Sequence, residues 1–268
     1  MDPWSSVFAA LLALALAAWL AAAVRARFAG FRGWRSLAFL SGALAAIAAA
    51  VSPLDGLGHD RLLTAHLAQH IALADLAAPL LLLGLPLPAR QRLSTAILSL
   101  GERESGWARA LTLALSPAGA FVLWAVVTYL WFVPTLHLLA APTGAVHLLD
   151  NLSFLGFGLL IWLGAFDPRP TRSWRDGLRQ GGIPWWGRHI YAMVTRLAML
   201  PPAFAVWLSG SSTYHDPTRP WPFSLSPGDD QELAASVMIG FEMVLFGVAV
   251  VLAFIFVAVS EGRKDWAR

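Results

Sequence analysis

Seven long apolar stretches divide the chain, and short polar segments separate them. A helix needs about 20 mostly apolar residues to cross the hydrocarbon core of a bilayer. We therefore expect an all-α, polytopic membrane helix bundle with seven transmembrane helices. Their predicted bounds are residues 5–24, 36–52, 62–86, 117–136, 146–166, 189–208 and 232–258. The connections are too short for a soluble domain, so residues 1–268 are expected to form a single membrane domain.

The basic residues indicate how these helices are oriented. Of the 19 Lys and Arg residues, 16 follow the first, third or fifth predicted helix or lie in the C-terminal tail. Only Arg61 and Arg219 lie on the opposite side, and Arg196 lies within a helix. Cytoplasmic loops carry the excess of Lys and Arg, so the N-terminus is expected outside and the C-terminus in the cytoplasm. We interpret the first stretch as a retained helix, because Asp2 stands where a signal peptide has basic residues.

Composition supports this class and restricts the chemistry. Hydrophobic residues make up 57% of the chain and charged residues 13%, about half of what a soluble protein carries. The net charge of +3 reflects the loop arginines and does not indicate nucleic-acid binding. The chain has no cysteine, which excludes disulfides, thiolate metal sites and iron–sulfur clusters. A soft or borderline metal ion would have to be held by His, Met and carboxylate groups.

The histidines are unevenly distributed across the predicted membrane. Six of the seven lie in outer loops or outer halves of helices, and only His189 lies on the cytoplasmic side. The six are His59, His66, His70, His137, His147 and His215. His66 and His70 are spaced i and i+4, so both imidazoles share one helix face and can reach one ion.

Two further polar groups begin predicted helices on the same outer side. His147, Asp150 and Asn151 share a face of the fifth helix, and the seventh helix begins with Asp229, Asp230 and Gln231, followed by Met238. Facing helices of a bundle can combine such groups into one metal site. The softness of these ligands favours copper over calcium or magnesium. Zinc is an alternative metal for the same ligands. Haem held by two histidines, His147 with His66 or His70, is another alternative.

Each group also has a purely structural interpretation. The pair His66 and His70 could hydrogen-bond loop carbonyls, and Asp150 could bond a neighbouring helix. Asp230 could be the N-cap of the last helix, and Met238 could be a packing residue. The remaining outer histidines, His59, His137 and His215, lie in loops, where we expect solvated side chains.

Three ionisable residues fall within predicted helices: Asp75, Arg196 and Glu242. Such groups are costly at membrane depth and are functional candidates. They could form a structural ion pair, with Arg196 facing Asp75 or Glu242, or they could line a path for a metal ion or proton. The sequence alone does not choose between these two interpretations.

Several protein classes are excluded by missing motifs. The sole lysine, Lys264, lies in the tail, so no retinal Schiff base can form within the bundle. The chain has no H-E-x-x-H, G-x-S-x-G, P-loop or G-x-G-x-x-G sequence. We therefore expect a protein that is not an enzyme.

Several short sequence blocks occur in order along most of the chain. They are Ser52-Pro53-Leu54, His66, Gln69 and His70 followed by 78–86 (APLLLLGLP), His137, 147–151 (HLLDN), and Asp230-Gln231 followed by Met238. With these blocks the chain resembles the CtaG-type cytochrome c oxidase assembly factors, a bacterial family of seven-span membrane proteins.

This resemblance implies a role in maturing haem-copper oxidases, by binding or delivering copper at the outer face of the bacterial plasma membrane. It implies oxidase subunits and copper chaperones as partners. The metal ligands it implies are His66, His70, His147, Asp150, Asp230 and Met238. Two alternatives stay open. The chain could be a transporter that moves a metal ion or proton past its intramembrane carboxylates, or an assembly scaffold without metal.

Overall fold

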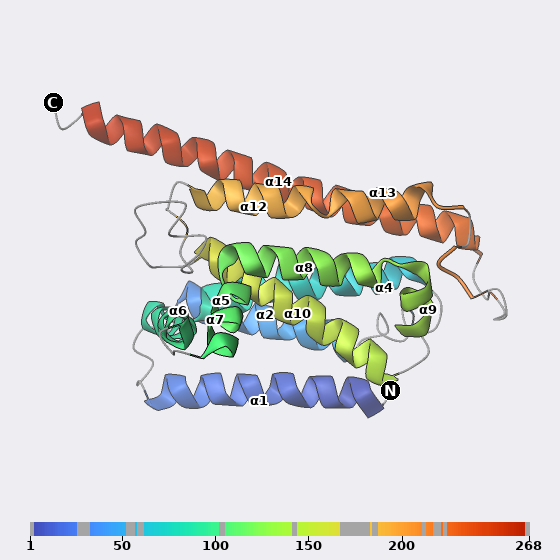
Figure 1. Cartoon of the computed structure of the whole chain (residues 1–268), viewed down its shortest axis with the longest axis horizontal. Coiled ribbons are helices and arrows are strands. Elements are labelled where there is room, and N and C mark those ends of the chain that lie inside the picture. Colours follow the sequence, from blue (N-terminus) through green and yellow to red (C-terminus); the bar gives the residue numbers. More distant parts are fainter. Residues whose placement is uncertain are drawn as a thin grey trace.

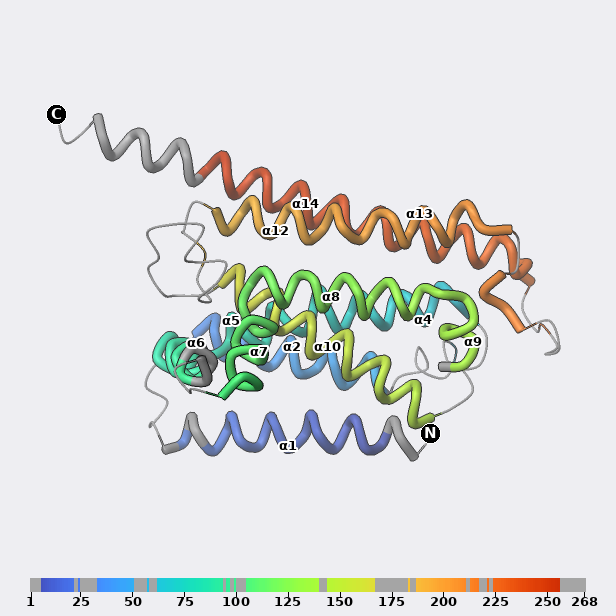
Figure 2. Tube along the Cα trace, in the orientation of Figure 1, coloured from blue at the N-terminus to red at the C-terminus, as the bar shows by residue number. Residues whose placement is uncertain are grey.

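The computed structural model describes residues 3–25, 33–51, 57, 62–101, 105–140, 144–166, 183, 187–210, 213–216, 221 and 224–265. Within this part of the chain the regular elements are all helical, and it contains no strand. The expected all-α class is therefore confirmed. Most of the long helices lie side by side along the long axis of the molecule (Figure 1), and Figure 2 follows the same trace from end to end.

The described residues form a series of helices along the chain. In order, they are α1 (Pro3–Arg25), α2 (Trp34–Val51), α4 (Leu63–Ile71), the π-helix η1 (Ala72–Ala77), α5 (Ala78–Gly84), α6 (Leu87–Gly101), α7 (Gly106–Ala114), α8 (Pro117–Trp131), α9 (Pro134–Ala140), α10 (Gly144–Phe166), α12 (Arg188–Leu197), α13 (Leu200–Leu208) and α14 (Pro227–Asp265). We call the end where α4, α10 and α14 begin the α9 end, and the opposite end the α6 end (Figure 1).

Four of the helical segments within the described residues are long and apolar enough to cross a membrane. They are Leu63–Gly84, Gly144–Phe166, Arg188–Leu208 and Pro227–Ile255. A fifth arises if α7 and α8, which meet at a bend of 75°, count as one broken span. Two shorter apolar helices, Ser6–Ala21 and Trp34–Ala50, stand beside them. The chain is thus a membrane protein with four to five spans by this measure, and seven spans stay a prediction.

Prolines explain where the helices differ from the predicted stretches. The stretch 117–136 divides, since α8 ends at Trp131 and α9 begins at Pro134. The stretch 189–208 divides after Leu197, just before Pro201 and Pro202. Proline has no N–H to continue a helical ladder, and its ring clashes with the preceding turn. The last helix begins at Pro227, five residues before the predicted start, because Ser226 caps it.

The segment α4–η1–α5 lies at the centre, in contact with α2, α10 and α14. Glycines allow these close approaches. A Cβ atom on Gly84 would lie 2.4 Å from the Cβ of Phe39 on α2, and one on Gly158 of α10 would lie 2.8 Å from the Cα of Ala74 in η1. Small residues let membrane helices pack backbone to backbone, so the central segment is held closely on two sides.

Candidate metal centre

Two histidines of α4 point into the interior near the α9 end. His66 and His70 are one helical turn apart on the buried face of α4, and their ring centroids are 4.2 Å apart. Both side chains are almost fully enclosed, with 2% and 4% of their surface exposed. The predicted common face for these two imidazoles is confirmed.

Asp150 reaches the two histidines from α10. Its Oδ2 lies 2.9 Å from Nε2 of His70 and 3.3 Å from Nε2 of His66. One donor atom from each of the three residues lies within 4.8 Å of the other two, so together they could hold one metal ion. Residues 80 positions apart in the sequence thus meet in a compact group of two nitrogens and a carboxylate oxygen.

Two more histidines surround His66. The ring centroid of His137, on α9, lies 4.9 Å from that of His66, and the centroid of His147, on α10, lies 5.6 Å from it. We call His66, His70, His137, His147 and Asp150 the histidine cluster. A solvated His137 was expected from its loop position, and that expectation is wrong, because α9 folds the side chain inward to 8% exposure.

Burial also sets the protonation of His137. The pKa of His137 lies well below its ordinary value because burial disfavours the charged ring and because a second charge beside His66 would be repelled. A neutral imidazole is the form that binds metals.

An aromatic side chain packs against the other α4 histidine. Phe154 is stacked on His70, with ring centroids 3.7 Å apart.

The histidine cluster contains buried polar atoms without hydrogen-bond partners. Among the described residues, His66 Nδ1, His70 Nδ1 and Asp150 Oδ1 have none. Buried polar atoms are nearly always bonded in folded proteins, and each exception calls for an explanation. Water could satisfy these three atoms. The atoms that face one another are Nε2 of the two histidines and Oδ2 of Asp150, and donors of these types fit a metal ion.

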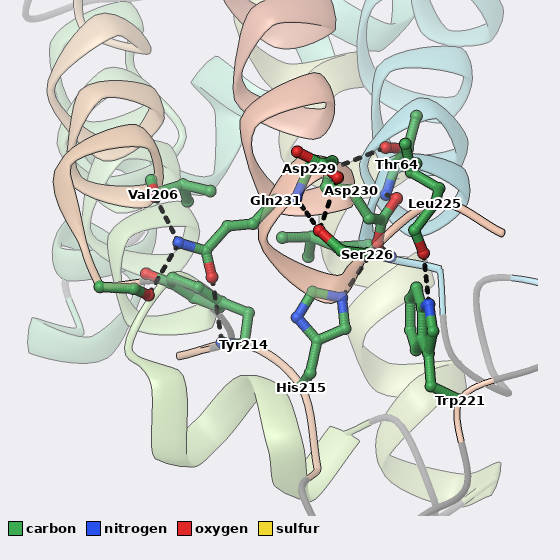
Figure 3. Close-up of polar contacts among 12 residues, drawn as sticks. Thr64, Val206, Tyr214, His215, Trp221, Leu225, Ser226, Asp229, Asp230 and Gln231 are labelled. Atoms are coloured by element: carbon green, nitrogen blue, oxygen red, sulfur yellow. Dashed lines mark hydrogen bonds and ion pairs between the residues drawn. The ribbon is translucent and has the colours of Figure 1, made fainter. Parts of the chain in front are cut away.

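Asp230, predicted as a metal ligand, lies at the start of α4. Its two carboxylate oxygens accept hydrogen bonds from the backbone N–H groups of Leu63 and Thr64, at 2.7 and 3.2 Å. These are the free N–H groups at the start of α4, so Asp230 caps that helix rather than its own. His215 Nε2 lies 3.0 Å from the same carboxylate, and Figure 3 shows this arrangement. The structure does not place Asp230 among the three grouped donors.

The neighbours of Asp230 complete this junction. Ser226 accepts from the N–H of Asp229 at 3.1 Å and so caps α14. Gln231 donates to the carbonyls of Val206 and Ser209, at 2.9 and 3.1 Å, which ties α14 to the end of α13 (Figure 3). The structure also tests the expected solvation of the other outer histidines. His215 was expected to be solvated, but its side chain is 9% exposed, so that expectation is wrong. His59 lies outside the described residues.

The three intramembrane ionisable residues meet in one place, which we call the arginine cluster: Asp75, Arg196 and Glu242. Arg196 Nη1 donates to Oδ1 of Asp75 and lies 3.2 Å from Oε2 of Glu242. The guanidinium also faces the rings of Trp162 and Trp124, at 5.3 and 5.8 Å from their centroids. Arg196 and Glu242 are 1% and 0% exposed, which favours the ion-pair interpretation.

The π-helix η1 follows the two α4 histidines and carries Asp75 of the arginine cluster. The carbonyl of Ala74 in η1 accepts a hydrogen bond from the indole of Trp162 at 3.0 Å. π-helical turns occur frequently at functional sites. A small cavity of about 10 Å³, room for about one water, is lined by His70, Asp75 and Met238 among others. Met238, predicted as a ligand, is 1% exposed and faces this cavity.

The fold and this site define a helical membrane protein with a buried group of side chains of the types that can bind a metal ion. The family described as cytochrome c oxidase caa3 assembly factor matches residues 16–259, so the chain belongs to that family. The resemblance drawn from the sequence is thereby confirmed. No curated protein and no solved structure matches the chain.

Sequence reasoning did not find every residue of the site. His137 was among the residues on which the family resemblance rests. Its place beside His66 could not be predicted, because it depends on the turn at Pro134. The two tryptophans that face Arg196 gave no signal, since aromatic residues are common in apolar helices. The pair Val133-Pro134 within the apolar stretch was the available clue. A residue before proline disfavours helix, so the chain can turn there and direct His137 inward.

Proposed function

We propose that this assembly factor binds a copper ion in its histidine cluster and delivers it to a cytochrome c oxidase subunit. The single observation that carries the proposal is the convergence of His66, His70 and Asp150, whose donor atoms lie within 4.8 Å of one another. Copper is the cargo of this reaction rather than a resident cofactor. A role in oxidase assembly is a property of the family, and the metal is our addition to it.

The donor set favours copper for chemical reasons. Imidazole nitrogens suit copper and zinc, and thioether sulfur adds a preference for the cuprous ion. Met238 lines a cavity with His70, so its sulfur could join the ligands after a small movement. The chain has no cysteine, so transfer cannot use thiolates. The cavities beside the cluster hold about 10 Å³ each, which supports a single ion over a haem.

We also infer the placement of the site in a bacterial plasma membrane. Each of the seven predicted stretches contains helix in the structure, and seven spans with the N-terminus outside would put the α9 end at the outer face. The 16 basic residues of the other side support this orientation. In that placement the histidine cluster lies about one to two turns below the outer surface, within reach of an oxidase subunit or a copper chaperone.

Metal analysis of the purified protein tests the proposal. We expect about one copper per wild-type chain after loading, and loss of that copper in a His66→Ala, His70→Ala double variant. His189→Ala is the matched control, because His189 lies in the first turn of α12, at the α6 end (Figure 1). Equal copper in the double variant and the control would contradict the site assignment. Zinc is measured in the same samples. If only the zinc content falls in the double variant and the copper content does not, zinc would replace copper in the proposal.

A second candidate function, transport of a proton or metal ion, has one observation in its favour. Asp75 lines the small cavity beside His70 and also a larger cavity that reaches Arg188 near the α6 end. Two cavities that share a carboxylate could form a path through the bundle. Transport into proteoliposomes tests this candidate. If the bundle contains a path, the wild-type protein transports the ion and Glu242→Gln abolishes that transport. If the chain is a copper-binding assembly factor, neither the wild type nor the variant transports it.

A further inference from the structure

A cavity of about 530 Å³ extends from the arginine cluster toward the α6 end. Its walls come from α5, α10, α12 and α14, and each of these helices belongs to one of the four segments long enough to cross a membrane. The volume lies within the range of roughly 300–1,000 Å³ found for pockets that hold small ligands. Protein interiors are otherwise closely packed. An occupant is therefore expected, and the medium around these four helices is lipid.

The lining of the cavity indicates the chemistry of that occupant. Most of the residues that line it are apolar, among them Leu83 on α5, Phe166 on α10, and Leu245, Val248 and Leu252 on α14. Apolar surface is stabilised by contact with other apolar groups rather than with water. The walls therefore favour a hydrocarbon over a water-soluble molecule.

The polar side chains that line the cavity are all engaged within the protein. They are Asp75, Trp162, Arg188, His189 and Arg196. Asp75 accepts a hydrogen bond from Arg196, and the indole of Trp162 donates to a carbonyl of η1. Arg188 Nε donates to a backbone carbonyl at 3.3 Å, and His189 also interacts with another group of the protein. The occupant thus needs neither a charge nor a hydrogen-bonding group inside the cavity.

The volume distinguishes a lipid chain from a helix of a partner protein. A helix with its side chains is about 10 Å across, so it would fill 530 Å³ over only about 7 Å of its length, little more than one turn. At roughly 30 Å³ for each non-hydrogen atom, as in liquid water, the cavity has room for about 18 such atoms. This is close to the size of one acyl chain.

We propose that this cavity binds one acyl chain of a membrane phospholipid, with the methyl end of the chain at the arginine cluster. Arg188 begins α12 at the α6 end (Figure 1), and Arg196 lies eight residues further along the same helix, about 12 Å deeper. A chain that enters beside Arg188 and ends beside Arg196 leaves its headgroup at the membrane surface. The chain fills the space that α12 and α14 leave against α5 and α10.

Photo-cross-linking of the purified full-length chain tests this proposal. The probe is phosphatidylcholine with a diazirine near the methyl end of one acyl chain, and mass spectrometry of peptides locates the label after irradiation. We expect label on Leu83 and Leu245, which line the cavity. Label on Val244, which is 63% exposed on α14, reports the lipid that surrounds any membrane protein. Label on Val244 without label on Leu83 would overturn the proposal.

Variants that fill the cavity provide the second part of the test. Ala249 on α14 lines the cavity and is buried, so Ala249→Phe should remove most of the label from Leu83 and leave that on Val244. Val251→Phe is the matched control, because Val251 is exposed on the same helix. Ala192→Phe makes the same test from α12, which also lines the cavity. Equal label on Leu83 in the filled variants and the control would contradict the assignment.

Competition identifies the kind of chain. Unlabelled phosphatidylcholine should displace the probe from Leu83. If a long-chain isoprenoid alcohol displaces it and phosphatidylcholine does not, the cavity takes an isoprenoid chain and the proposal of an acyl chain is wrong. None of these readouts depends on copper, so the copper proposal can fail or hold independently.

Discussion

The histidine cluster and the arginine cluster are both buried, yet they differ in how their charged groups are paired. In the arginine cluster, one guanidinium lies against two carboxylates and two indole rings, although Arg196 Nε and Glu242 Oε2 have no hydrogen-bond partner among the described residues. In the histidine cluster, Asp150 lies against two imidazole rings, and Nδ1 of both α4 histidines and Oδ1 of Asp150 likewise have no hydrogen-bond partner there. The comparison indicates that the arginine cluster stabilises the fold through a permanent positive charge between carboxylates, whereas the histidine cluster, built from imidazoles that can be neutral, has capacity for a metal ion.

The largest expected effect comes from removing the cation of the arginine cluster. Arg196→Met leaves Asp75 and Glu242 as uncompensated buried carboxylates, which should lower the free energy of unfolding by about 3–5 kcal/mol. Denaturant titration in detergent measures it, and Arg92→Met, on the exposed face of α6, is the control. If the two variants are equally stable, the arginine cluster does not stabilise the fold and the comparison fails.

A smaller effect is expected where α10 meets η1 between the two clusters. Gly158→Ala would bring a Cβ within 2.8 Å of the Cα of Ala74 and 2.9 Å of its carbonyl oxygen, while a Cβ on Gly156 meets nothing within 4 Å. We expect Gly158→Ala to cost about 1–3 kcal/mol, as overpacking does, and Gly156→Ala to cost much less. The same unfolding titration checks both, and an equal cost for the two glycines would show that the contact with η1 is loose.

Variants of the adjacent residues Asp229 and Asp230 distinguish a helix-capping role from a metal-binding role. Asp230→Ala removes the cap of α4 and should cost about 1–2 kcal/mol, without lowering the number of copper ions bound per folded chain. Asp229→Ala should cost less, because Asp229 is exposed at the start of its own helix. Loss of the copper ion in Asp230→Ala, with α4 still folded, would instead make Asp230 a ligand.

The smallest effect concerns two tyrosines that both donate to backbone carbonyls. Tyr214 donates to Phe132 at 2.8 Å and is buried, whereas Tyr129 donates to Ala198 at 2.7 Å and is exposed. Tyr214→Phe leaves a buried carbonyl unpaired and should cost about 1 kcal/mol. Tyr129→Phe should cost less, because water can replace the lost bond. Unfolding titrations of the two variants test this order.

The pH dependence of Tyr214 gives the same test a second readout. Burial raises the pKa of Tyr214 above its ordinary value of 10, so the folded state holds this proton more tightly than the unfolded state. The contribution to stability is complete below pH 10 and is lost as pH rises through the folded-state pKa. Stability of the wild-type protein should therefore fall above pH 10 more steeply than that of Tyr214→Phe. Parallel curves would show that Tyr214 ionises freely.

Local spacing in the sequence was enough to predict the class of fold and part of the candidate site. The i and i+4 spacing of His66 and His70 fixes their common helix face, since this relation depends only on helix geometry. The same holds for His147 and Asp150 on α10. The residues Asp75, Arg196 and Glu242 were identifiable because ionisable groups rarely occur in apolar stretches.

Relations between distant elements could not be predicted in this way. The cap that Asp230 provides joins residues 167 positions apart, and a capping side chain normally serves its own helix. The π-helix η1 has no sequence signature in an alanine- and leucine-rich segment, and it depends on the packing of Gly158 and Trp162 against Ala74. These features follow from tertiary packing, which local periodicity does not encode.

Copper X-ray absorption on the loaded, purified protein tests the central claim most directly, because it reads the ligands of the ion itself. The histidine cluster should give a first shell of nitrogen and oxygen donors with the outer-shell scattering of at least two imidazoles, and the His66→Ala, His70→Ala variant should lose that signal. A copper spectrum without imidazole scattering, or one that the double variant leaves unchanged, would contradict the assignment of copper to this cluster.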